Sequence, residues 1–237
     1  MPQLIAMIIV VVGAMIYMFQ TFGGTGDKIE GIAQKTSVIT EINNIKNGLK
    51  LAARSRHIAD AVSADTDAVI NLQGLAELAY FPEQINNQLT DTDAPADFNV
   101  YSAISFGGID GTSTSEDTEN FTSAMKISLV VSPGMIPGIF VNLADGSLGA
   151  NAGFLESQIA TDLAAVATID RAATSTTVTP KTSVGSNTPI ENRTPVLGTR
   201  SSTLDIDGKF IIYFNDFGAN EVVVDATEAT GDSTGDW

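Results

Sequence analysis

An apolar run of membrane-spanning length near the start of the chain limits its fold more than any other feature. Residues 4–19, LIAMIIVVVGAMIYMF, are apolar apart from the Tyr17 hydroxyl, and residues 1–26 carry no charged side chain. About 20 apolar residues in a helix are enough to span a bilayer. The run is therefore compatible with a signal peptide, a simple membrane anchor or a helix that packs with copies of itself.

The residues on either side of this run argue against the first two interpretations. A secretory signal has a basic region before its apolar run and a small-residue cleavage site after it, but no Lys or Arg precedes Leu4 and no Ala-x-Ala follows Phe19 closely. A permanent anchor usually ends in basic and aromatic interface residues, whereas this run leads into Gly23, Gly24 and Gly26. The pattern is typical of a mature chain whose basic leader has been removed.

The glycines also predict a local break in the helix. Each glycine weakens a helix by roughly 0.5 to 1 kcal/mol relative to alanine, so we expect an extended or unwound backbone somewhere within residues 20–27. Gly13, alone inside the apolar run, is a weaker candidate because single glycines in such helices more often mark close packing.

A second helix follows the glycines, with apolar residues on one face. Steps of three and four residues predict an amphipathic helix over residues 28–59. The apolar positions are Ile29, Ile32, Ile39, Ile42, Ile45, Leu49 and Ala52. Together with the apolar run, this helix would reach on the order of 80 Å, so one end must protrude from the folded head.

Charge separates the amphipathic helix from the rest of the chain. Six basic residues and two acidic ones give residues 28–56 a charge of +4. Because the net charge of the whole chain is −16, the remaining residues carry −20. An acidic head without a Lys/Arg cluster repels phosphate, which argues against nucleic-acid binding. Cysteine is absent, which excludes disulfides and cysteine-ligated metals.

The remaining residues, 60–237, are expected to form an α/β head. Periodicity predicts helices over 68–80 and 153–168, strands over 100–106 and 126–131, and a loop over 87–98. Pro133 and Pro137 interrupt the chain after the second strand. Residues 174–203 read as a Ser/Thr-rich excursion, the Asp207-Gly208 pair as a hairpin turn, and residues 220–226 as a last strand.

Few residues suggest a catalytic, cofactor-binding or metal-binding function. His57 is the only histidine, and it is expected to be a solvated group near the C-terminus of a helix. No phosphate-binding loop, dinucleotide-binding motif or nucleophile elbow is present, so an enzyme is not expected and no cofactor is predicted. A calcium site is one interpretation of the oxygen-bearing side chains Asp205, Asp207, Asn215 and Asp216. Solvated strand edges are the other interpretation.

Two short patterns and the C-terminus remain. Asn120-Phe-Thr and Asn192-Arg-Thr match the N-glycosylation pattern and are expected on the surface. Trp237 ends an acidic tail and is expected to be a frayed terminus.

Taken together, the apolar run, its amphipathic extension to residues 54–59 and the expected α/β head resemble a type IV pilin, most closely the larger type IVb class. The resemblance implies an α+β fold in which a long protruding N-terminal helix packs on an antiparallel-sheet head. It implies a leader removed by a prepilin peptidase, which makes Met1 the processed terminus. Ile5 departs from the family, which usually has glutamate at that position.

The resemblance implies a major pilin: a non-catalytic subunit that polymerises with itself into an extracellular filament for adhesion, motility, aggregation or uptake. Its other partners would be the assembly machinery and, before assembly, the inner membrane. The basic residues Lys46, Lys50 and Arg54 are expected to meet acidic surfaces of neighbouring heads. The alternatives are a pseudopilin of a secretion system, or a monomeric membrane-anchored binding protein or enzyme.

Overall fold

The structure, a computed structural model, describes residues 31–59, 69–90, 99–108, 123–132, 134–178, 194–199 and 206–217. A helix over residues 31–54, called the long helix below, comes first. The elements after it are α2 (Leu72–Glu77), α3 (Glu83–Thr90), β1 (Val100–Ser102), η1 (Ile104–Phe106), β2 (Lys126–Val130), β3 (Gly138–Asn142), η2 (Gly146–Asn151), α4 (Ala152–Leu163), β4 (Ala167–Asp170) and β5 (Lys209–Phe214).

The strands form one antiparallel sheet in the order β1-β2-β3-β5-β4. Register places Tyr101, Ile127, Val141 and Phe210 in one row across four strands. Successive residues of a strand point to opposite faces, so Phe210, Ile212 and Phe214 share the face that carries this row. Every residue of β5 after Lys209 is buried, which means that both faces of the sheet are covered at its centre.

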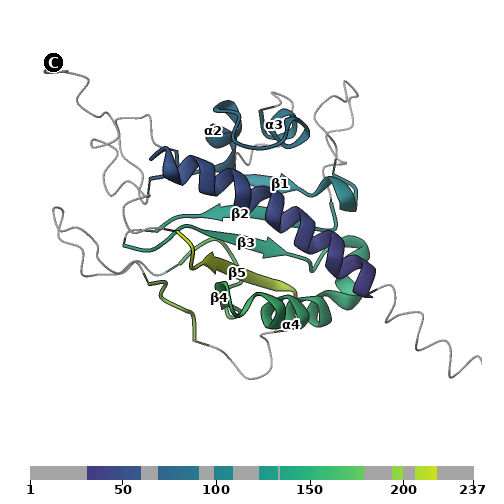
Figure 1. Cartoon of the computed structure of the whole chain (residues 1–237). Coiled ribbons are helices and arrows are strands. Elements are labelled where there is room, and N and C mark those ends of the chain that lie inside the picture. The colour runs from purple at the N-terminus through teal and green to yellow at the C-terminus, as the bar shows by residue number, and fades with distance from the viewer. Residues whose placement is uncertain are drawn as a thin grey trace, which may run out of the picture.

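The long helix lies across one face of the sheet (Figure 1). Its buried stripe recurs every three or four residues and joins the same hydrophobic core as the strands. The stripe consists of Val38, Ile42, Ile45, Leu49, Ala52 and Ala53. The predicted stripe is therefore confirmed from Ile42 onward, but Ile32 is 59% exposed and Ile39 only partly buried. Val38 provides the apolar contact at that level instead.

The long helix ends in two backbone hydrogen bonds that fold its last turn back. Arg56 N–H donates to Ala53 O at 2.9 Å, and His57 N–H donates to Ala52 O at 2.9 Å. This is the Schellman arrangement, in which the residue after the helix adopts a left-handed conformation. Arg56 occupies that position with φ 58°, where glycine is usual.

Two short helices replace the elements expected between residues 68 and 98. The predicted helix over 68–80 is shorter, because Val69 forms a parallel bridge with Ile58 and α2 begins only after the Asn71 cap. The loop predicted over 87–98 is wrong for residues 87–90, which complete α3. In α3, Ile85 and Leu89 lie one turn apart and are buried, and the apolar contact outweighs the weak helix propensity of its two asparagines.

The strands differ from the expectations at three places. The strand predicted over 100–106 is correct only for β1, since a 3-10 turn follows at Ile104–Phe106. The strand over 126–131 is confirmed as β2, which ends at Val130. Strand β3, which begins directly after Pro137, was not predicted.

The helix predicted over 153–168 ends early. α4 stops at Leu163, Val166 is 46% exposed, and the next four residues pair with β5 as β4. The sheet edge thus competes successfully with continued helix. The predicted turn at Asp207-Gly208 precedes β5, with Gly208 at φ 82°, but Ile206 before it lies in no strand.

The described residues thus form an α+β fold with an N-terminal helix and a five-stranded antiparallel sheet. The described helices include none that is both long and apolar enough for a bilayer crossing. The predicted segment 1–27 and the predicted strand 220–226 lie outside the described residues, as does most of the excursion over 174–203.

Candidate functional site

The junction between the long helix and the sheet holds the described assembly residues proposed from the sequence. Lys46 and Lys50 lie one turn apart on the long helix and Arg54 is its last residue. The other proposed assembly residues lie outside the described residues: Met1, Ile5, Gly13, Gly23, Gly24 and Gly26. Of the proposed assembly residues, the structure therefore describes only Lys46, Lys50 and Arg54.

Lys46 and Lys50 both bind Asp216, two residues after β5. Their Nζ atoms lie 3.2 and 2.6 Å from Asp216 Oδ2. Lys46 Nζ also lies 4.6 Å from the centroid of the Phe214 ring, a cation–π contact. Burial alone would raise the pKa of Asp216, but its hydrogen bonds to Lys50 and Lys46 and their charges outweigh burial and lower the pKa. The two lysines thus have an acidic partner within their own chain.

Glu41 makes a second, buried connection between helix and head. Its side chain is 3% exposed, and its carboxylate accepts hydrogen bonds from Tyr101 Oη at 2.9 Å and Ser105 N at 3.1 Å. Burial, followed by the negative charge of Glu41, raises the pKa of Tyr101, so the hydroxyl keeps its proton. Because a buried carboxylate needs such donors, this group fixes the rotation of the helix on the sheet.

Sequence reasoning missed Glu41, although a signal was present. Glu41 lies three residues after Val38 and four before Ile45, which is the spacing of the buried stripe. A single carboxylate on an otherwise apolar face indicates a buried polar contact. Its partners, Tyr101 and Ser105, belong to β1 and η1 and could not be predicted from local pattern.

Two further contacts tie the beginning of the described helix to α4. Lys35 Nζ lies 2.7 Å from Asp162 Oδ2, and Asn151 Nδ2 donates to Gln34 Oε1 at 3.3 Å. Together with the contacts of Glu41, Lys46 and Lys50, these bonds attach the helix to the head from residue 34 to residue 50. The long helix is therefore connected to α4, to β1 and to the end of β5.

A buried ion pair organises the other side of α4. Glu156 is fully buried, and its Oε1 accepts from Arg171 Nε at 2.5 Å while its Oε2 accepts from Gly208 N at 3.0 Å. Burial raises the pKa of Glu156, while Arg171 and the Gly208 N–H act in the opposite direction. This carboxylate links α4, the end of β4 and the turn before β5.

The calcium candidates do not come together. Asp207 precedes β5 and accepts from Lys209 N at 2.9 Å, whereas Asn215 and Asp216 follow the strand at its other end. Asn215 accepts from Thr168 Oγ1 at 3.1 Å. A strand of this length separates its ends by roughly 20 Å, so these three side chains cannot share one ion. Asp205 is outside the described residues, among which no group of three His, Cys, Asp or Glu side chains is arranged to hold a metal.

His57 is half-buried rather than solvated, which corrects the expectation for it. Its Nδ1 lies 2.6 Å from Tyr80 Oη, and the two rings meet edge to face. The contact fastens the end of the long helix to the segment between α2 and α3. Asn120, Asn192 and Trp237 lie outside the described residues.

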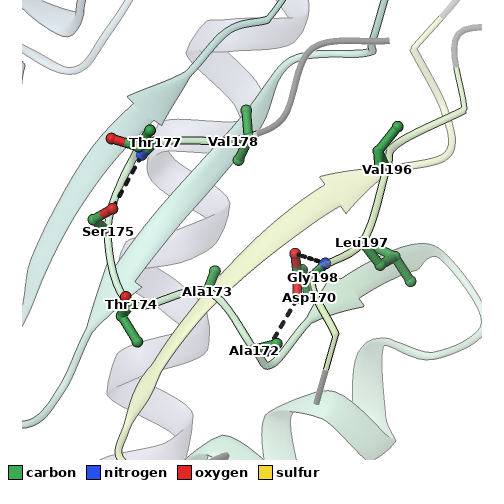
Figure 2. Close-up of a pocket in the computed structure, with 10 residues that line it drawn as sticks. All are labelled: Asp170, Ala172, Ala173, Thr174, Ser175, Thr177, Val178, Val196, Leu197 and Gly198. Carbon is green, nitrogen blue, oxygen red and sulfur yellow. Dashed lines mark hydrogen bonds between the residues drawn. The ribbon is translucent and has the colours of Figure 1, made fainter. Parts of the chain in front are cut away.

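A small cavity lies on the sheet face opposite the long helix (Figure 2). It measures about 140 Å³ and is lined by Asp170 and by parts of residues 172–178 and 196–198. Asp170 is 4% exposed, and its carboxylate accepts from Ala172 N at 3.0 Å and Gly198 N at 2.8 Å. The carboxylate thus joins Ala172, just before the Ser/Thr-rich excursion, and Gly198, within it, to the end of β4.

Comparison with known proteins found no match to the chain among protein-family models, curated proteins or solved structures.

Proposed function

We propose that this chain is the structural subunit of an extracellular filament of the type IV pilus kind, a major pilin. The observation that carries the proposal is that an uncharged N-terminal segment leads directly into a helix that is firmly attached to a folded head. Residues 1–26 contain no charge, and the helix that follows is attached to the head by ion pairs and hydrogen bonds from residue 34 to residue 50. These contacts reach Asn151 of η2, Asp162 of α4, Tyr101 of β1 and Asp216 after β5. A helix attached in this way can bear tension between an apolar filament core and a folded head.

In this proposal residues 1–27 of many copies pack together and the heads face solvent. A charge of −20 outside residues 28–56 would be costly to bury, which favours an outward position for the heads. The subunit polymerises and catalyses nothing. Its partners are other copies of itself, a prepilin peptidase and an assembly machinery, with the inner membrane holding the subunit before assembly.

The proposal gives the glycines and Ile5 definite roles. Gly23, Gly24 and Gly26 allow the chain to leave the helical conformation within residues 20–27, so that the two helices can differ in direction and the filament can extend. Ile5 contributes apolar packing where related filaments use a carboxylate, because a lone buried carboxylate would cost several kcal/mol. Ile5→Ala is expected to impair assembly, and Ile5→Glu is expected not to improve it.

Arg54 gives the sharpest test of contacts between heads. Its side chain is exposed and forms no ion pair with another described residue, whereas Lys46 and Lys50 are engaged with Asp216. Arg54→Glu is expected to reduce filament yield while lowering the free energy of unfolding of the subunit by no more than about 1 kcal/mol, the effect of an anion at a helix C-terminus. Arg54→Lys is expected to retain both the yield and the stability. Wild-type filament yield in the Arg54→Glu variant would argue against a contact between Arg54 and the acidic surface of a neighbouring head.

The cavity beside Asp170 supports a second candidate, a monomeric membrane-anchored binding protein. In that case the head would carry the function and the apolar segment would only hold it at the membrane. A pseudopilin would share the architecture of the first proposal and differ in filament length and abundance. Release of the protein from sheared cells separates these cases.

A further inference from the structure

Three large apolar side chains from separate parts of the chain are exposed at one place. Ile32 of the long helix is 59% exposed, Phe154 of α4 is 48% exposed, and Ile206 before β5 is 61% exposed. Monomeric proteins seldom gather such residues on a surface without a partner. We call these three residues the apolar foot.

Close approaches at two glycines bring together the three chain segments that carry the foot. A methyl group at Gly31, next to Ile32, would lie 3.2 Å from the Phe154 ring. A methyl group at Gly153, next to Phe154, would collide with the side chain of Ile206. The long helix, α4 and the turn before β5 thus meet at close range, and α4 lies beside the N-terminal end of the long helix in Figure 1.

The position of the foot indicates its partner. Eleven residues, 20–30, separate the apolar run from Gly31, and they span at most about 36 Å when fully extended. Where residues 4–19 occupy a bilayer, this short connection keeps the foot, which adjoins the first described residues of the long helix, within reach of the lipid surface. From this placement, which rests on the proposed function, we propose that the foot docks on the lipid surface and orients the unassembled head on the membrane.

Lipid suits the foot better than a second head does. The net charge of −16 makes two heads repel each other, whereas a neutral headgroup layer does not repel them. Apolar side chains next to a membrane anchor bury themselves at the boundary between headgroups and acyl chains. The tether raises the effective concentration of the membrane to the millimolar range, so a contact too weak to bind vesicles unaided is still populated.

The absence of cysteine from the chain permits a direct test with single labels. The full chain is inserted into phosphatidylcholine vesicles, with an environment-sensitive fluorophore on Ile32→Cys or on Ile206→Cys. The matched control is Leu78→Cys, because Leu78 is 46% exposed but follows α2, away from α4 (Figure 1). We expect a blue shift and quenching by lipids with a shallow nitroxide at positions 32 and 206, and neither at position 78.

A second variant tests the foot as a unit. Phe154→Ser is expected to reduce quenching of the label at position 206 several-fold, whereas Leu78→Ser leaves it unchanged. Water-like emission at positions 32 and 206 in a chain that floats with the vesicles would overturn the docking alone and leave the filament proposal intact. A blue shift that disappears when subunits are diluted in lipid would also overturn it, since a second copy would then cover the foot. A chain that does not float with the vesicles would contradict both proposals.

Discussion

At the scale of single residues, Gly48 shows how close packing outweighs helix propensity. A methyl group at Gly48 would lie 2.7 Å from Tyr80 O and would also collide with the Phe81 ring. Gly48→Ala improves helix propensity by about 1 kcal/mol, but overpacking costs roughly 1 to 3 kcal/mol. We expect net destabilisation of about 1 kcal/mol in urea unfolding. Asn47→Ala, on the exposed face of the same turn, should instead stabilise the protein by about 0.5 kcal/mol, because alanine has the higher helix propensity. A more stable Gly48→Ala variant would mean that the helix does not press on this segment.

At Arg56, in contrast, we expect a substitution by glycine to stabilise the protein. It holds φ 58° at the end of the long helix, a conformation that costs a non-glycine residue roughly 1 kcal/mol. Arg56→Gly should therefore raise the free energy of unfolding by about 0.5 to 1 kcal/mol. Ala33→Gly, exposed within the same helix, should lower it by a similar amount. An Arg56→Gly variant as destabilised as Ala33→Gly would exclude the Schellman ending.

At the scale of elements, the Glu156–Arg171 pair joins α4 to two strands. Removing only Arg171 leaves a buried carboxylate without its cation, which typically costs 3 to 5 kcal/mol. Replacing both partners by apolar residues of similar size is often neutral. We therefore expect Arg171→Met to destabilise by about 3 kcal/mol and the double variant Glu156→Leu, Arg171→Met to recover most of the loss. Additive losses in the urea-unfolding free energies would show that the two side chains do not interact.

The attachment of the long helix to β5 should depend on pH through Asp216. The lowered pKa means that this carboxylate stabilises the fold above its ordinary value of 3.8 and that the contribution is lost as pH falls through the folded-state pKa. We expect wild-type protein to lose more stability than Asp216→Asn on acidification below about pH 4. The difference between the two proteins isolates Asp216, because Glu156 is present in both. Parallel pH profiles would contradict a stabilising contact of Asp216 with Lys46 and Lys50. The exposed Glu77→Gln serves as the control.

Sequence patterns predicted those elements whose own periodicity decides their structure. The stripe of the long helix and the alternation of β2 are of this kind. β3 was not predicted because Pro137 directly precedes it. β4 was not predicted because its residues continue the apolar spacing of α4, although in the structure they pair with the edge of β5. The acidic partner of Lys46 and Lys50 could not be predicted either, since Asp216 is 166 residues from Lys50 and only the sheet brings them together.

At the scale of the whole molecule, the chain joins two parts of different character, a folded head and an uncharged apolar segment. The head buries one apolar core to which the long helix, α4 and both faces of the sheet contribute, while residues 1–26 carry no charge that would favour water. Under the proposed function, the apolar segment needs an apolar environment. The proposal places that environment first in a membrane and then among other copies.

Shearing intact cells that express the full chain tests whether the protein is a filament subunit. A major pilin is released in quantity, sediments as polymer at high speed and appears as filaments in the electron microscope. The inner-membrane fraction would retain only a precursor pool, and lysis is controlled by following a cytoplasmic marker. Protein that stays with the membrane after shearing, and is monomeric when extracted in mild detergent, would contradict the filament proposal.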